Sequence, residues 1–306
     1  MTRDLSPPSP LRSSGDGPSP DASSSGAPAT TLDRFLDGRL VVEQPAKGRH
    51  RAGLDAILLA ATVADDASGI LVDLGAGVGT AGLAAAVRAP GLTVRLAERD
   101  PEVLRLAEAN IVRNGLADRA ATIAVDLLGP AKAREAMLPR ECAAHAVCNP
   151  PFYARHSVRA SPREDRAAAH VLASGGLADW VRVAAATLEP HGRLSLIFEG
   201  GGLGEIVAAL TGRFGAASIR PIHPREDAPA HRLLVTAIKG SRAGPRILPG
   251  LILHPEGSAA YLPKAEAVLR GHAGLGGGRD DLTDRAAGAD RRSDRRRHGS
   301  SSAAAW

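Results

Sequence analysis

The stretch from Cys148 to Tyr153, CNPPFY, sets an amide beside two consecutive prolines and two aromatic rings. Neither a helix nor a central strand tolerates consecutive prolines, because each lacks an N–H group and has a fixed φ. The apolar run before this stretch therefore ends in a stiff turn. The oxygen of Asn149 can accept hydrogen bonds there, and the ring of Phe152 can stack on a planar substrate.

A second candidate site is the glycine-rich sequence VDLGAGVGTAG, residues 72–82. Gly75, Gly77 and Gly79 allow a tight turn and a close approach of the backbone to a ligand. In an open parallel sheet such a turn lies at the carboxyl end of the strands, where ligands bind. The pattern leaves the ligand open, because Gly77, Gly79 and Gly82 also match the dinucleotide pattern G-x-G-x-x-G. A tight turn that binds no ligand would have the same composition.

Two carboxylates end the next two predicted strands. Glu98 stands where an acid can hold both hydroxyls of a ribose, a position that serves NAD and S-adenosylmethionine alike. Asp126 could accept a hydrogen bond from an adenine amine. Taken alone, each carboxylate fits a solvated acid at a strand end equally well.

The residue before the glycine turn favours the methyl donor. Asp73 stands two residues before Gly75 and completes the pattern D-x-G-x-G-x-G, which resembles the first motif of Rossmann-like methyltransferases. The resemblance implies S-adenosyl-L-methionine as the cofactor. The residues expected to bind it are Asp73, Gly75, Gly77, Gly79, Glu98 and Asp126.

The proline turn resembles the (N/D)-P-P-(Y/F) motif of amino-group methyltransferases that act on adenine, guanine or glutamine. An amine on an aromatic ring is a poor nucleophile, and orientation can lower the barrier of its in-line attack on the methyl by several kcal/mol. The Asn149 oxygen and the Pro150 carbonyl suit the two amine hydrogens, and Pro151 stiffens the loop. This scheme needs no strong base and no metal. The expected catalytic residues are Asn149, Pro150, Pro151 and Phe152.

Strands and helices alternate around these segments. Apolar runs predict seven strands at residues 69–75, 93–100, 121–128, 143–149, 192–200, 218–224 and 232–240. Helices are expected at 54–66, 80–89, 101–115, 131–138, 177–190 and 202–215, and a hairpin at 33–44 turns around Asp37-Gly38. The order predicts the α/β class: a Rossmann-like, mainly parallel seven-stranded sheet with an antiparallel strand near the end and helices on both faces.

Composition limits the folded part of the 306 residues. Residues 1–30 and 274–306 have few large apolar side chains, so they are expected to be disordered tails around one methyltransferase domain at 31–273. The chain has no apolar run of membrane-spanning length and no signal peptide, which predicts a cytoplasmic protein. Its two cysteines, Cys142 and Cys148, are expected to be reduced thiols. A net charge of +5 is compatible with a nucleic-acid partner but does not by itself indicate RNA.

Residues 33–272 resemble the bacterial valine-tRNA adenine-N(6) methyltransferase family beyond these two motifs. The entry segment LDGRLVVEQPAKGRHRAGLDAILLAA carries the elements that this family places before its glycine turn: Gln44, Pro45, Gly48, Arg51, Gly53 and Asp55. The resemblance implies methylation of an adenine amine in a tRNA anticodon loop, and tRNA as the partner. Candidate RNA contacts follow the proline turn at Arg155, Arg159, Arg163 and Arg166, although a solvated face explains these arginines equally well.

Other functions remain open from the residues alone. Release-factor glutamine methyltransferases have a similar loop with Tyr in place of Phe152, but they carry an N-terminal helical domain that residues 1–30 cannot provide. Related rRNA guanine methyltransferases often have a duplicated domain, and only one is found here. A catalytically silent RNA-binding module would not need every expected site residue, and the presence of all of them argues against this alternative. An NAD-dependent oxidoreductase leaves the segment from Asn149 to Phe152 unexplained.

Overall fold

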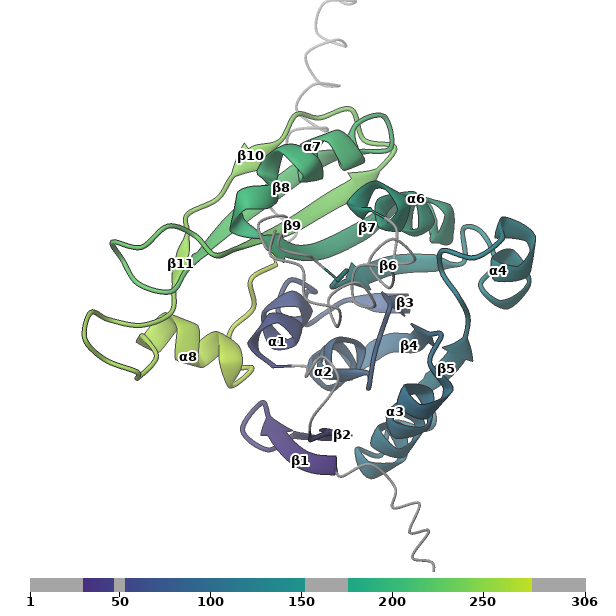
Figure 1. Ribbon diagram of the computed structural model, residues 1–306, viewed down its shortest axis with the longest axis horizontal. Helices are drawn as coiled ribbons and strands as arrows, with labels where there is room; N and C mark the ends of the chain where they lie inside the picture. The colour runs from purple at the N-terminus through teal and green to yellow at the C-terminus, as the bar shows by residue number, and fades with distance from the viewer. Residues whose placement is uncertain (1–29, 47–52, 152–175, 277–306) are drawn as a thin grey trace, which may run out of the picture.

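The computed structural model of the chain describes residues 30–46, 53–151 and 176–276 (Figure 1). The two expected tails lie outside these ranges except for Thr30 and residues 274–276. Leu275 is buried, and its N–H donates to the carbonyl of Ala61 at 2.6 Å, so packing extends past residue 273. Several residues singled out above lie outside the described ranges: Gly48, Arg51, Phe152, Tyr153, Arg155, Arg159, Arg163 and Arg166.

The seven expected strands form the central sheet, which confirms the predicted fold class. They are β3 (Ser68–Leu74), β4 (Gly91–Glu98), β5 (Ala120–Ala124), β6 (Ala143–Cys148), β7 (Leu188–Glu199), β8 (Phe214–His223) and β9 (Arg232–Lys239). The order is β8-β9-β7-β6-β3-β4-β5, and β9 runs antiparallel to both neighbours. Two short strands, β10 (Arg246–Ile247) and β11 (Leu251–Ile252), add to the other side of β8. Strands of two residues show no alternation in sequence, so these two were not predicted.

Helices cover both faces of the sheet (Figure 1). The helices are α1 (Leu54–Ala60), α2 (Thr80–Arg88), α3 (Pro101–Arg113), α4 (Ala131–Met137), α6 (Leu177–Thr187), α7 (Leu203–Leu210) and α8 (Pro263–Leu269), with a 3₁₀ turn at Gly200–Gly202. Successive strand residues point to opposite faces: Leu71 packs in the core with α1 and α2, and Val72 packs in the core with α6 and α7. None of the helices within the described ranges combines the length and apolarity that crossing a membrane requires.

The helix expected at 54–66 is wrong in length, because α1 ends at Ala60. The N–H groups of Thr62 and Val63 donate three residues back, to Leu59 and Ala60, and the chain then turns away from the helix axis. The carbonyl of Ala61 accepts the N–H of Leu275, so a segment more than two hundred residues away occupies the position where the helix would continue.

Asn110 of α3 and Asn114, which caps the end of that helix, attach the expected hairpin, β1 (Thr30–Phe35) and β2 (Leu40–Pro45), to the rest of the molecule. Asn114 exchanges two hydrogen bonds of 2.8 Å with the backbone of Val41. Asn110, fully buried, accepts the N–H of Glu43 at 2.7 Å and donates to the Glu43 carbonyl at 2.9 Å. The two amides lie one helical turn apart and pair with alternate residues of β2, so they take the place of a neighbouring strand. Asn110 also donates to the Val78 carbonyl in the glycine turn at 3.1 Å.

Replacement of Asn110 by alanine should lower the free energy of unfolding by about 2–4 kcal/mol, because backbone groups of Glu43 and Val78 would lose their buried partners. Urea unfolding measures this change. Val112→Ala is the matched control, since Val112 lies on the same helix and is 71% exposed. Equal losses in the two variants would show that the amide pairing does not hold the hairpin.

Candidate active site

The two candidate segments meet at the carboxyl edge of the central sheet. The chain leaves β3 through the glycine turn and leaves β6 through Asn149. Leu74 pairs with Cys148 in the parallel ladder, so Gly75 and Asn149 follow directly on neighbouring strands. β4 and β5 lie on one side of β3, and β6 and β7 lie on the other (Figure 1). Such a reversal of strand order opens a crevice in which α/β proteins bind their ligands.

Backbone conformation and packing both require glycine in the turn. Gly75, Gly77 and Gly79 have φ angles of 73°, 56° and 90°, a region that other residues rarely adopt. A Cβ atom on Gly75 would lie 2.8 Å from the Trp180 ring, and one on Gly79 would lie 2.6 Å from Leu96. A Cβ atom on Gly77 would meet no other described atom within 4 Å. Gly77 is therefore the point at which the turn is open to a ligand.

Glu98, the last residue of β4, fixes the open part of the turn. Its Oε2 accepts the N–H of Gly77 at 3.0 Å, and its Oε1 accepts those of Arg99 at 2.8 Å and Asp100 at 2.9 Å. A carboxylate has about four lone-pair sites, so these bonds leave capacity for a ligand hydroxyl. The ribose contact stays a prediction, and positioning Gly77 is a role that the sequence did not indicate.

Asp73 lies beneath the turn. It is 3% exposed, and its Oδ2 accepts the N–H of Gly82 in α2 at 2.8 Å. Burial raises the pKa of the Asp73 carboxyl to about 7; the Gly82 hydrogen bond opposes this shift, and the charge of Glu98 adds to it. The observed contact holds the first turn of α2 against β3. Direct contact of Asp73 with a cofactor stays a prediction.

Asp126 lies two residues beyond β5 and is exposed. The N–H of Val125 donates to the Glu98 carbonyl at 2.9 Å, which carries Asp126 to the same edge of the sheet as Glu98. Its Oδ1 accepts the N–H of Leu128 at 3.1 Å in a local turn. Asp126 is thus fixed and accessible, as its predicted contact with an adenine amine requires.

The proline turn begins directly after β6. Asn149 is half-buried, Pro150 is buried and Pro151 is exposed, whereas Phe152 lies outside the described residues. Burial, with the nearby charge of Asp73, raises the pKa of the preceding Cys148 thiol well above its usual value. Cys148 therefore stays a protonated thiol and not a nucleophile. Both Cys148 and Cys142 are free cysteines, as expected.

The charge of the site suits a cation. Glu98 and Asp126 come from two adjacent strand ends, and clefts lined by one sign of charge concentrate ligands of the other sign. A sulfonium group with an amino acid tail fits that field. Within residues 30–46, 53–151 and 176–276, no group of three or more His, Cys, Asp and Glu side chains could hold a metal ion.

Two residues of the site were missed in the sequence. Trp180 of α6 lies against Gly75 and closes one side of the turn, although the pattern of its helix indicates only a core position. Asn110 holds the Val78 carbonyl from behind. A large aromatic side chain in the helix that follows the proline turn was the only available signal for Trp180. The signal for Asn110 was its position as a polar residue on the apolar face of its helix.

Residues 51–201 match the family model of the methyltransferase small domain. Among solved structures, a predicted O-methyltransferase, protein Atu636 from Agrobacterium tumefaciens, is 38% identical and has a TM-score of 0.63; the match covers 73% of this chain and 99% of that one. TYW2 of M. jannaschii is 12% identical, with a TM-score of 0.49 and 70% and 87% of the two chains covered. The 16S rRNA N2 G1207 methyltransferase of T. thermophilus is 20% identical, with a TM-score of 0.48 and 69% and 50% covered. No curated protein matches the chain.

Glu98→Ala should weaken the binding of S-adenosylmethionine by about 1–3 kcal/mol, the scale of a lost charged hydrogen-bond partner. Isothermal titration calorimetry measures this loss. Glu189→Ala is the matched control, because Glu189 is an exposed glutamate at the start of β7, on the opposite edge of the sheet. If Glu98→Ala bound S-adenosylmethionine with unchanged affinity, Glu98 would not be part of the donor site.

Asp73→Asn should alter the pH dependence of stability. Asparagine keeps an acceptor for the Gly82 N–H but cannot ionise. Because burial raises the pKa of Asp73 from 3.8 to about 7, the folded protein keeps a proton that the unfolded chain releases, and stability falls as pH rises through this window. Between pH 5 and pH 7 the unmodified protein should lose about 2 kcal/mol of unfolding free energy relative to the variant. Urea unfolding at both pH values tests this, and a constant difference would mean that Asp73 is ionised when folded.

Proposed function

Since this chain belongs to the methyltransferase small-domain family, we propose that it methylates the N6 amine of an adenine in tRNA. The chain is a methyltransferase with S-adenosylmethionine as the donor, because the family uses that cofactor. The substrate is the proposed part. It rests above all on one observation: an Asn-Pro-Pro turn follows β6 directly beside the glycine turn that follows β3.

The proposed reaction is a direct displacement. The lone pair of the adenine N6 attacks the methyl carbon of the donor, and the bond from that carbon to sulfur breaks. The electron pair stays on sulfur, which leaves S-adenosylhomocysteine, and the methylated nitrogen releases one proton to water. The side-chain oxygen of Asn149 and the carbonyl of Pro150 would accept the two amine hydrogens. These two bonds would aim the lone pair at the methyl and raise the rate by positioning.

Donor binding is assigned to the glycine turn. Gly77 offers an open backbone, Glu98 has spare acceptor capacity for the ribose hydroxyls, and Asp126 is exposed near it for the adenine amine of the donor. The carboxylates of this edge favour the positive sulfonium. Gln44 and Asp55, which the family resemblance singled out, have structural partners instead: Gln44 donates to Asp33, and Asp55 pairs with Arg232 at 2.9 Å.

Transfer to oxygen is the second candidate, since the 38% identical Agrobacterium protein is described as a predicted O-methyltransferase. A hydroxyl nucleophile usually needs a base that removes its proton. Near Asn149, the described titratable groups suit this role poorly. Cys148 is a buried thiol with a raised pKa, and Asp73 is buried and bonded to Gly82. An amine that is held by acceptors and needs no strong base fits the site better.

Product analysis tests the substrate. The purified protein is incubated with labelled S-adenosylmethionine and, in separate reactions, unmodified tRNA, rRNA and release-factor protein. Mass spectrometry of the products should find N6-methyladenosine in tRNA. A ribose 2′-O-methyl product would support transfer to oxygen, and methylguanosine in rRNA or methylglutamine would support the other amino-group alternatives. Any of these three products without N6-methyladenosine contradicts the proposal.

Asn149→Ala should slow methyl transfer by about a hundredfold or more and leave donor binding nearly unchanged, because it removes a contact that orients the amine in the displacement. Asn149→Asp is the matched control, since it keeps an acceptor oxygen and the (N/D)-P-P-(Y/F) pattern, and it should retain more activity than Asn149→Ala. Tritium transfer to tRNA and calorimetry with the donor are the two readouts. Near-normal turnover in Asn149→Ala would show that the proline turn only ends strand β6 and has no catalytic role.

A further inference from the structure

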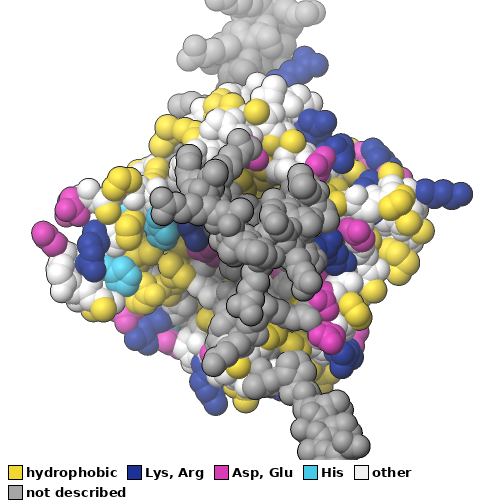
Figure 2. Space-filling model, in the orientation of Figure 1, with side chains coloured by type: hydrophobic (Ala, Val, Ile, Leu, Met, Phe, Trp, Pro, Cys, Tyr) yellow, Lys and Arg dark blue, Asp and Glu magenta, His cyan; other side chains and the backbone are white. Residues whose placement is uncertain are grey.

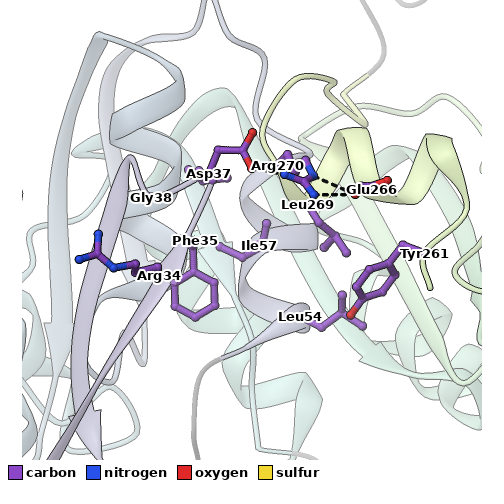
Figure 3. A pocket seen from close by; sticks show the side chains of 11 residues that line it. Arg34, Phe35, Asp37, Gly38, Leu54, Ile57, Tyr261, Glu266, Leu269 and Arg270 are labelled. Carbon is purple, nitrogen blue, oxygen red and sulfur yellow. Dashed lines mark hydrogen bonds and ion pairs between the residues drawn. The ribbon is translucent and has the colours of Figure 1, made fainter. Parts of the chain in front are cut away.

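A cavity of about 500 Å³ lies away from the glycine turn, between the β1–β2 hairpin, the first turns of α1, and α8 (Figure 3). Its interior is apolar. The ring of Phe35 stands on one side and the ring of Tyr261 on the other, with Leu54, Ile57 and Leu269 between them. Two rings around an aliphatic floor suit a flat, aromatic ligand, and the volume lies within the range of small-molecule sites.

The Tyr261 ring is held in place before any ligand arrives. It stacks on the ring of His254, with the ring centroids 4.6 Å apart and an angle of 27° between the planes. His254 is fixed in turn by a 3.0 Å hydrogen bond between its Nδ1 and the Ala260 carbonyl. Tyr261 is nevertheless 40% exposed, so one face of this wall remains accessible.

Polar groups border the cavity on one side. Arg270, which caps the end of α8, bridges two carboxylates, Asp37 and Glu266, each at 2.7 Å, and His272 also pairs with Asp37 at 3.0 Å. The carboxylates are held at fixed positions while their remaining lone pairs stay available. Carboxylates accept hydrogen bonds from the amino groups of nucleobases. The carboxylates on this side of the cavity can therefore accept hydrogen bonds from the amino group of a nucleobase.

A cation is available on the Phe35 side of the cavity (Figure 3). Arg34 lines the cavity and is exposed, and it forms no ion pair with any residue that the structure describes. Arg39, in the same hairpin, donates to the carbonyls of Leu36, Arg270 and Gly271, and among the described residues no carboxylate pairs with it. Such arginines suit phosphate contacts, which position a nucleic acid without reading its sequence.

The cavity lies on the same edge of the sheet as Asn149. Asp55, in the first turn of α1, pairs with Arg232, and Arg232 lies opposite Glu199 at the carboxyl end of β7. β7 runs parallel to β6, which ends just before Asn149. Figure 2 shows this side of the molecule: hydrophobic and histidine side chains gather over α8 and β11, with Lys and Arg side chains beside them.

We propose that this cavity binds one unpaired nucleobase of the RNA substrate, outside the target adenine, between Phe35 and Tyr261. The inference rests on the proposed function, because an RNA that presents an adenine to Asn149 must also cross this edge of the protein. The neighbouring base stacks on the aromatic walls, its amine faces Asp37 and Glu266, and Arg34 contacts a flanking phosphate. Stacking on side chains is how proteins commonly hold unpaired bases of RNA.

The test measures RNA binding by the full chain, with fluorescence anisotropy on two probes: unmodified valine tRNA and a single-stranded RNA heptamer of mixed sequence. Tyr261→Ala should raise the Kd of tRNA about tenfold or more, and Tyr261→Phe should bind like the unmodified protein. Arg34→Ala should lower the slope of log K against log salt by about 0.7–0.9. Arg242→Ala is its matched control, because Arg242 is an exposed arginine after β9 at the opposite edge of the sheet.

The outcomes separate this inference from the proposed function. Loss of binding in Tyr261→Ala, with donor affinity unchanged and Tyr261→Phe intact, supports the cavity as a base site. If the tRNA is methylated but Tyr261→Ala binds it with unchanged Kd, the cavity proposal is wrong and the proposed function stands. If the tRNA is not methylated but the heptamer binds in a Tyr261-dependent way, the base site stands and the tRNA assignment is wrong. Binding of neither RNA overturns the inference.

Discussion

Two hydrogen bonds that backbone N–H groups donate to carboxyl side chains hold the turn between β3 and α2, and the rest of the site depends on them. Asp73 accepts the N–H of Gly82 at 2.8 Å, and Glu98 accepts that of Gly77 at 3.0 Å. Fixed acceptors suit a turn rich in glycine, whose backbone has the most freedom to lose. The result is an open backbone at Gly77 that is rigid relative to the sheet.

The same frame supports both proposed binding sites. Asn110 donates to the Val78 carbonyl of the glycine turn and also pairs with Glu43 of β2. The hairpin that contains β2 also contains Phe35, one wall of the apolar cavity. The donor turn and the proposed base site are thus tied to one buried amide. A substrate held at the cavity would therefore have a defined position relative to Asn149, which displacement at a methyl group requires.

The sequence predicted those parts of the molecule that local pattern determines. Alternating and apolar runs indicate the seven main strands, and because parallel strands end at one edge, Glu98, Asp126 and Asn149 could be placed together. Long-range partners could not be predicted: Trp180 against Gly75, Asn110 with a strand 67 residues away, and Leu275 at the end of α1. Asp73 shows the same limit, since its motif indicated a cofactor ligand, whereas only the fold reveals its burial under the turn.

The central claim is that the methyl donor lies across the glycine turn with its reactive group directed at Asn149. A crystal structure of the protein with sinefungin, in which an amine replaces the transferred methyl, tests this most directly. The account predicts ribose hydroxyls on Glu98, the base near Asp126, and the sinefungin amine facing the side chain of Asn149. A ligand that sits instead between Phe35 and Tyr261, or whose amine points away from Asn149, would contradict it.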